Sequence, residues 1–187
     1  IGVGDTRIQG FNFRLCMTDN SANQLPVPEP VSYDSLQYEL LGRAVAGSPL
    51  YDWSLDDFFL MNALPNDKSD WNNYGKSIVS TDYVGGNWDY PEATYAHREE
   101  IVFAHRQWIL GLFKFLREDP RIPAAVKTEL ALWGLCADEF TDTGGWPHQL
   151  YVREARRMVG QKVMTERDVM SQTRVEDFIA FGSYAMD

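Results

Sequence analysis

The sequence predicts an α+β fold that is mainly helical, with a few short strands. Three observations support this prediction. Residues 93–117 repeat apolar side chains at steps of three and four, as an amphipathic helix does. Residues 7–18 alternate apolar and polar side chains, as a strand does. Glycine and proline separate the other elements. The 187 residues are 44% hydrophobic and 13% aromatic, so we expect one ordered domain over residues 1–187.

The first elements are a strand, a loop and a helix. The strand over residues 7–18 enters a loop that runs to residue 30, where three prolines prevent regular structure. A helix is predicted over residues 35–46, because Gly47 and Pro49 follow it as stop signals.

Residues 50–92 are polar and predict a long irregular stretch with one short helix near 55–61. Such a stretch is either a poorly ordered excursion or a functional loop. Its aromatic residues favour an ordered loop: Trp53, Trp71, Tyr74, Tyr83, Trp88 and Tyr90.

The clearest element is the helix over residues 93–117, which ends before Pro120 because proline disfavours helix in the residue preceding it. A second helix is predicted over residues 123–132, ending near Gly134. The apolar face of the first helix consists of Ile101, His105, Trp108, Leu112, and Phe115 or Leu116.

A third helix is predicted over residues 147–159, from a proline that suits a first helical turn to the stop signal Gly160. Two short strands are expected after it, around residues 162–165 and 178–180.

The start of this third helix is the first candidate site. The preceding Gly144 and Gly145 can adopt backbone angles that other residues avoid. A helix start carries free N–H groups and a positive dipole end, which favour an anion. Three arginines add donors that bind carboxylate or phosphate through two hydrogen bonds each: Arg153, Arg156 and Arg157. We expect at least one to point toward the glycine turn, near His148. The alternative is a solvated helix face with Glu154 as a local partner.

His148 and Trp146 form the second candidate. A helix start disfavours a charged imidazole, so His148 would be neutral and able to exchange a proton or hydrogen bond with a ligand. A purely structural histidine is the alternative.

The third candidate is the segment 80–95, where Gly85 and Gly86 permit a sharp bend. Trp88 and Tyr90 offer flat apolar faces with polar edges, which suit a sugar ring or an aromatic ligand. The alternative is a loop that its aromatic side chains attach to the core.

Charge and composition exclude several classes of function. The net charge is −10, and residues 19–92 hold 12 acids against 3 bases. Such a chain would repel nucleic acid. Only residues 140–174 are locally positive, with 6 bases against 4 acids. No apolar run reaches the ~20 residues that span a bilayer, so no membrane association is expected.

Metal sites and covalent nucleophiles find little support. His97 and His105 lie two helical turns apart, too far to share one small ion, so no metal is expected. Cys16 and Cys136 lack metal-ligand spacing and sit among apolar neighbours, which favours buried free thiols over a disulfide.

Four stretches of the chain carry a resemblance to a known family. They are RIQGFNFRLC (7–16), STDYVGGNWDYPEATY (80–95), FTDTGGWPHQLYVREARRMVG (140–160) and GSYAMD (182–187). Together they resemble the FAD-dependent oxidoreductases, a large bacterial and fungal group in which some members are labelled xanthan lyase. The Gly-x-Gly-x-x-Gly motif that binds the dinucleotide in this family is absent from the chain, and Ile-Gly-Val-Gly at the start does not replace it.

This resemblance implies an internal part of a longer flavoprotein: the cap or substrate-side region, lying between two halves of an FAD-binding domain. FAD would be the cofactor of the intact protein, and the rest of the polypeptide would be the partner of this chain. His148 would transfer protons, and Arg153 with Arg156 or Arg157 would neutralise an anionic substrate group or a flavin phosphate. The pocket would be shaped by Trp146, Trp88 and Tyr90.

On this interpretation the substrate is a small molecule, anionic or sugar-like, and the chain alone neither binds FAD nor catalyses a reaction. An interaction domain with no small-molecule site is one alternative. The other is a non-catalytic carbohydrate-binding module that uses the aromatic-rich stretch 51–95.

Overall fold

The computed structural model describes all residues except 1–5, 75–77, 157, 174–175 and 177–187. The chain divides into two compact units, each considered by itself. One comprises residues 7–155, and the other takes in residues 1–6 and 156–187. In the second unit, the described element is the short helix α4 (Glu166–Val169). The expected strand at 162–165 is wrong, since those residues lead into the N-cap of α4. The strand expected at 178–180 lies outside the described residues.

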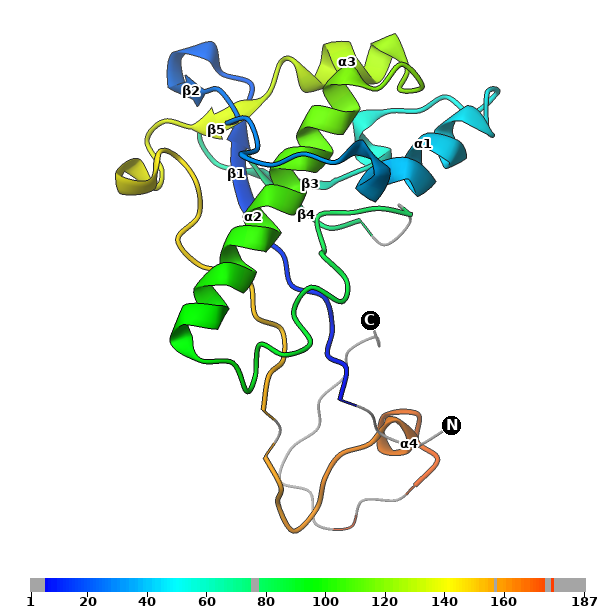
Figure 1. Ribbon diagram of the computed structural model, residues 1–187, viewed down its shortest axis with the longest axis vertical. Helices are drawn as coiled ribbons and strands as arrows, with labels where there is room; N and C mark the ends of the chain where they lie inside the picture. The colour runs from blue at the N-terminus through cyan, green and yellow to red at the C-terminus, as the bar shows by residue number, and fades with distance from the viewer. Residues whose placement is uncertain (1–5, 75–77, 157, 174–175, 177–187) are drawn as a thin grey trace. The chain divides into compact units, whose positions relative to one another are not determined.

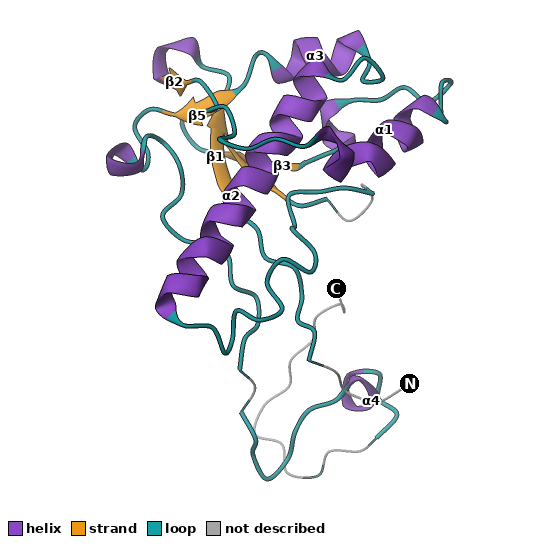
Figure 2. Ribbon diagram, in the orientation of Figure 1, coloured by secondary structure: helices purple, strands orange, loops and turns teal. Residues whose placement is uncertain are grey.

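The larger unit is an α+β fold built on one antiparallel sheet (Figures 1 and 2). Its strand order is β2-β5-β1-β4-β3. The strands are β1 (Leu15–Thr18), β2 (Gln24–Leu25), β3 (Leu60–Leu64), β4 (Lys68–Asn72) and β5 (Gly134–Cys136).

Three predicted helices are confirmed. The 3-10 turn Ser35–Tyr38 and helix α1 (Glu39–Ala46) occupy the first predicted range. The long helix α2 (Tyr95–Glu118) begins at the N-cap Thr94, whose side chain accepts from the His97 N–H. Helix α3 (Ala124–Leu130) is the third. In the described part of the chain, no helix combines the length and apolar character needed to cross a membrane.

Three local predictions are corrected. The stretch 50–92 is not irregular throughout, because β3 and β4 form a hairpin across Asn66 and Asp67, which take left-handed φ values of 63° and 57°. The short helix at 55–61 is only the 3-10 turn Leu55–Asp57. The strand at 7–18 is regular over β1 alone, preceded by an isolated bridge between Asn12 and Tyr151.

No helix forms over the described residues of the predicted range 147–159. The chain bends at residues 148–149 and then pairs with the residues before β1, where the Tyr151 N–H donates to the Asn12 carbonyl at 2.8 Å. Trp146 and Leu150 are buried in the core. An isolated helix of this length is marginal in water, so strand pairing and side-chain burial outweigh the helical signals.

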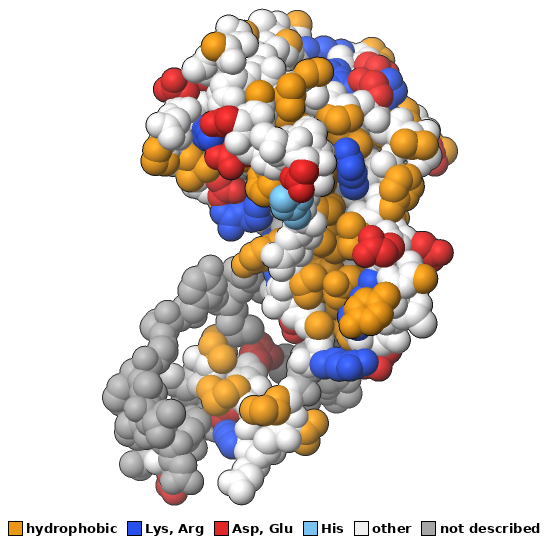
Figure 3. Space-filling model, turned by 90° about the vertical axis from the view of Figure 1, so that its left-hand side faces the viewer, with side chains coloured by type: hydrophobic (Ala, Val, Ile, Leu, Met, Phe, Trp, Pro, Cys, Tyr) orange, Lys and Arg blue, Asp and Glu red, His pale blue; other side chains and the backbone are white. Residues whose placement is uncertain are grey.

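The sheet has an apolar face and a polar face because side chains alternate along its strands. Leu15 and Trp71 are cross-strand partners and both are buried. Trp71 stacks on Phe113 of α2, with ring centroids 5.9 Å apart. On the opposite side, Arg14 pairs with Asp70, with Nε and Oδ1 at 3.0 Å. Charges of both signs are also interspersed on the face drawn in Figure 3.

The predicted apolar face of α2 is confirmed, with Trp108 at its margin. Ile101, His105 and Leu112 are buried, whereas Trp108 is half-buried between the rings of Tyr38 and Tyr83, at 4.9 and 4.8 Å. The Trp108 indole N–H donates to the Ser80 carbonyl at 2.9 Å. This side of α2 therefore holds the 80–95 segment.

His105 makes folding sensitive to mild acid. It is fully buried; its Nδ1 donates to the Ile101 carbonyl at 2.7 Å, while Nε2 has no partner among the described residues. Burial lowers the pKa of His105. The unfolded chain therefore binds a proton below about pH 6.5 that the folded chain takes up only at lower pH.

We predict that the free energy of unfolding falls as pH drops below about 6.5, by up to ~1.4 kcal/mol per pH unit from this group. His105→Leu should flatten the profile between pH 7.5 and 5.5, measured by denaturant unfolding. His97→Gln is the control of opposite sign, because Glu100 and Asp89 raise the pKa of the exposed His97. The stability that His97 contributes is present below about pH 6.5 and is lost as pH rises through its folded pKa. An unchanged slope in His105→Leu would contradict the assignment.

Candidate functional site

A cluster of polar side chains gathers where four segments of the larger unit meet. These segments are the residues before β1, the end of β4, residues 80–83 and the extended run 151–153. We call it the Arg153 cluster; its members are Asn12, Asn72, Asn73, Thr81, Asp82 and Arg153.

Arg153 is the centre of the cluster. Its Nη1 donates to the Gly10 carbonyl at 3.1 Å and to Asp82 Oδ2 at 2.9 Å, and its Nη2 donates to Asn73 Oδ1 at 2.8 Å. The side chains of Arg153 and Asp82 are only 16% and 13% exposed. Three of the five guanidinium N–H groups are used in these bonds, so the arginine is fixed in position and its charge is balanced by Asp82.

Asn12 extends the cluster into the core. It is fully buried, and its amide donates to Asn72 Oδ1 at 2.6 Å and to Thr81 Oγ1 at 3.3 Å. Its Oδ1 has no partner within the described ranges. Since a buried acceptor without a donor costs ~1–3 kcal/mol, the cluster can take one further donor, such as a water molecule, at this point.

The segment 80–95 packs beside the Arg153 cluster, and two glycines and one asparagine determine its conformation there. A Cβ at Gly86 would lie 2.5 Å from the Tyr83 ring, so the close approach requires glycine there. Gly85 has a φ of 85°. The Asn87 amide donates to the Gln9 carbonyl at 2.6 Å and joins this segment to the residues before β1.

The two aromatic candidates of this segment have different surroundings. Trp88 is 45% exposed, with the Arg7 guanidinium 5.8 Å from its ring centroid. Tyr90 packs against the core, with its ring 5.3 Å from Phe11, and Arg98 lies over it at 4.9 Å. Trp88 can therefore offer a ring to a ligand, whereas Tyr90 mainly attaches the loop.

The glycine turn positions His148 at the surface. Gly144 and Gly145 have positive φ values, 68° and 80°, as their sequence context predicts. The His148 side chain is 53% exposed, and its Nε2 lies 2.7 Å from Asp142 Oδ1. This hydrogen bond lowers the pKa of Asp142. Trp146, two residues earlier, is buried against Phe13 at 5.3 Å.

Arg153 is the arginine of the three whose surroundings the structure describes within the larger unit. It is held by Gly10, Asn73 and Asp82, none of which belongs to the glycine turn, and no hydrogen bond joins it to His148 among the described residues. Arg156 is exposed and belongs to the smaller unit. Arg157 lies outside the described residues.

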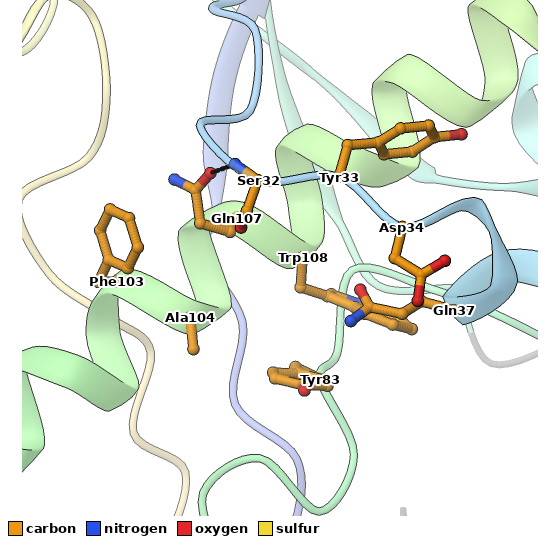
Figure 4. Close-up of a pocket in the computed structure, with 9 residues that line it drawn as sticks. All are labelled: Ser32, Tyr33, Asp34, Gln37, Tyr83, Phe103, Ala104, Gln107 and Trp108. Atoms are coloured by element: carbon orange, nitrogen blue, oxygen red, sulfur yellow. Dashed lines mark hydrogen bonds between the residues drawn. The ribbon is translucent and has the colours of Figure 1, made fainter.

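A cleft of about 350 Å³ lies beside α2, and Tyr83 of the 80–83 segment contributes to its lining (Figure 4). Tyr83 and Trp108 stack at its wall, and Phe103 is 51% exposed at its rim. The Gln107 Oε1 accepts from the Val31 N–H at 2.6 Å, which fixes the orientation of its amide. The cleft is lined by Ser32, Tyr33, Asp34, Gln37, Tyr83, Phe103, Ala104, Gln107 and Trp108.

The sequence singled out Arg153 as a candidate but did not indicate its hydrogen-bond partners. One pattern could have pointed to the partners before β1. Gly10, Asn12 and Arg14 alternate with the buried residues Phe11, Phe13 and Leu15, so they lie on the same side of the chain. Asn73 and Asp82 lie in a stretch with many exposed acids and amides, where nothing local distinguishes them. Within the described ranges, no three His, Cys, Asp or Glu side chains are arranged to hold a metal ion.

Comparison with known proteins identifies a family. The family model described as "FAD dependent oxidoreductase" matches residues 1–187. No curated protein and no solved structure matches the chain.

Arg153→Met should lower the free energy of unfolding by ~2–4 kcal/mol, because it leaves the Asp82 carboxylate with little solvent and without its cation. Arg153→Lys should cost less, since it keeps the charge but loses the planar fork. Denaturant unfolding measures both. Arg43→Met is the matched control: its pair with Glu39 is exposed, so the change should stay within ~0.5 kcal/mol. A loss below ~0.5 kcal/mol for Arg153→Met would show that the pair does not stabilise the fold.

Proposed function

The chain belongs to the FAD dependent oxidoreductase family, and from this premise we propose that it forms the substrate-side, or cap, region next to the flavin in an intact oxidoreductase. One observation carries the proposal. Three of the four stretches that resemble this family, 7–16, 80–95 and 140–160, meet at the Arg153 cluster through Gly10, Asp82 and Arg153 itself. Segments that are far apart in the sequence thus contribute to one hydrogen-bonded cluster.

FAD is the cofactor of the intact protein, and it supplies hydride transfer at N5 of its ring. The described residues do not fit its dinucleotide part. A pyrophosphate cradle needs a parallel strand–turn–helix–strand unit with a glycine-rich turn, whereas every strand pair described here is antiparallel. The dinucleotide would therefore be held outside these residues, and the role proposed for this chain is to bind and orient the substrate.

Within that role, Arg153 would orient the substrate more than attract it. Asp82 already balances its charge, but its remaining N–H groups can donate to a carboxylate or hydroxyl. Such a site would receive a small anionic or sugar-like molecule.

His148 would exchange protons with the substrate. Its imidazole is half-exposed, and its bond to Asp142 orients the ring, as a general acid or base requires. Trp88 would form a wall of the substrate pocket with its exposed ring, supported by Tyr90, while Trp146 would hold the turn from inside the core.

In the intact polypeptide, we expect a yellow protein absorbing near ~450 nm. A panel of small carboxylates and monosaccharides, mixed anaerobically, identifies substrates by bleaching of this band. His148→Gln should slow bleaching by ~10²-fold or more without changing flavin content. Lys114→Gln, at an exposed ion pair away from the cluster, is the control and should leave the rate unchanged.

Two results would overturn this proposal. The first is loss of flavin from the His148 variant, which would place this residue at the cofactor rather than at the substrate. The second is a saturable change in FAD fluorescence on titration with the 187-residue chain alone, which would show that a dinucleotide site exists within it.

The cleft of Figure 4 supports a second candidate, a non-catalytic carbohydrate-binding module. Tyr83 belongs to the aromatic-rich stretch 51–95, and amide, carboxylate and hydroxyl groups surround the cleft as they do in sugar sites. The stacked rings of Tyr83 and Trp108 present mainly edges, because Tyr38 covers the other face of Trp108 and Gly86 lies against Tyr83. Phe103 supplies the exposed ring.

Under this second function, monosaccharides should change the tryptophan fluorescence of the chain saturably. Phe103→Ala should weaken binding at least ~5-fold, because the apolar wall is lost. Leu132→Ala, another exposed apolar residue, is the matched control and should bind normally. Equal binding by wild type and Phe103→Ala would exclude the cleft as the sugar site.

A further inference from the structure

The only two cysteines of the chain are neighbours in space, although they lie 120 positions apart. Cys16 lies in β1 and Cys136 in β5, two strands that pair directly. The strand register sets Met17 opposite Leu135, which places the two cysteines at the next positions along the ladder. Their Sγ atoms are 3.2 Å apart, and both thiols are free.

A covalent bond needs only a small movement from this arrangement. A disulfide has an S–S length of about 2.05 Å, so the two sulfur atoms must approach by about 1 Å, which side-chain rotation can supply. The strands that carry the cysteines are already held in register by the sheet. The backbone therefore need not rearrange, which is the usual obstacle to joining two cysteines.

We propose that Cys16 and Cys136 form a reversible intramolecular disulfide, a redox modification site of this chain. The proposal is independent of the flavin and of the substrate site. Its oxidant is a small-molecule disulfide such as oxidised glutathione.

The reaction would begin at Cys16, which is partly exposed, whereas Cys136 is fully buried. The Cys16 thiolate attacks one sulfur of the external disulfide, forming a mixed disulfide and releasing one thiolate. Cys136 then loses its proton to solvent and attacks the Cys16 sulfur, and the second external thiolate leaves. Overall, two protein thiols lose two electrons and two protons, and one external disulfide is reduced to two thiols.

The environment of the two thiols slows thiol–disulfide exchange but does not prevent it. Burial is the main cause that raises the pKa of Cys16, and it raises that of Cys136 to about 12, so few thiolates exist at neutral pH. The charged groups near the pair are Lys68, Asp138 and Glu139; Lys68 lowers the pKa of both thiols, and Asp138 raises it. Uncatalysed exchange of such thiols takes on the order of minutes to hours, so the site would respond slowly to a change in redox conditions.

Oxidation would stabilise the larger unit. The bond closes a loop that contains most of residues 7–155, and a long loop loses more entropy from the unfolded chain than a short one does. The melting temperature of the oxidised protein should exceed that of the reduced protein by roughly 10 °C.

The test equilibrates the purified chain in glutathione buffers from fully reducing to fully oxidising, followed by acid quenching and peptide mapping. We expect one cross-linked peptide pair containing Cys16 and Cys136, a mass lower by two hydrogens, and no thiol reactive with a chromogenic reagent after denaturation. Cys16→Ser and Cys136→Ala should lose both the cross-link and the rise in melting temperature.

Wild-type mapping needs no variant, so it decides the proposal even if a substitution prevents folding. Two free thiols in the most oxidising buffer would overturn it. Glutathione adducts on single cysteines without the cross-linked peptide would also overturn it, because they would show access for the oxidant without approach of the two sulfur atoms.

Discussion

The partly buried ion pair between Arg153 and Asp82 is the constraint on which the rest of the Arg153 cluster depends. An arginine with only 16% of its side chain exposed must find acceptors for its N–H groups, and it finds them in three separate segments. Residues 10, 73 and 82 are thereby fixed relative to one another. The extended conformation of residues 151–153 belongs to the same arrangement, because pairing of Tyr151 with Asn12 places Arg153 beside the strand.

The aromatic core provides the rigid support for this polar cluster. Trp71 and Phe113 join β4 to α2, and the stack of Tyr38, Trp108 and Tyr83 joins α2 to the 80–95 segment. Glycine makes the stack possible, since a Cβ at Gly111 would lie 2.2 Å from the Tyr38 hydroxyl. Residues 80–83 thus contribute to both places, since Asp82 pairs with Arg153 and Tyr83 lines the cleft of Figure 4. A ligand bound at either place would act on the same short segment.

The polar clusters of this unit lie on one side of the sheet. Arg14 and Cys16 of the chain through β1 alternate with buried residues, and Asp70 and Asn72 of β4 do the same. Ion pairs, the asparagine network and the thiol pair all lie along these strands. Helix α2 packs on the apolar side, which therefore forms part of the hydrophobic core. If the chain binds a substrate at this sheet, the polar face is the one that can contact it.

The sequence by itself determined the three helices and the family. Their apolar spacing and stop signals are local, so no tertiary information was needed, and the family follows from long motifs. The positive φ values at Gly144 and Gly145 were also predictable, because glycine is the residue type that readily adopts them. Only the tertiary structure decided the rest. The β3–β4 hairpin has weak strand formers and is stabilised by burial of Trp71. Residues 147–153 do not form the predicted helix, which would be marginal on its own, because Tyr151 pairs instead with Asn12, 139 positions away. The partners of Arg153 could not be predicted either, because a buried charge is satisfied by residues that only the fold brings within hydrogen-bonding distance.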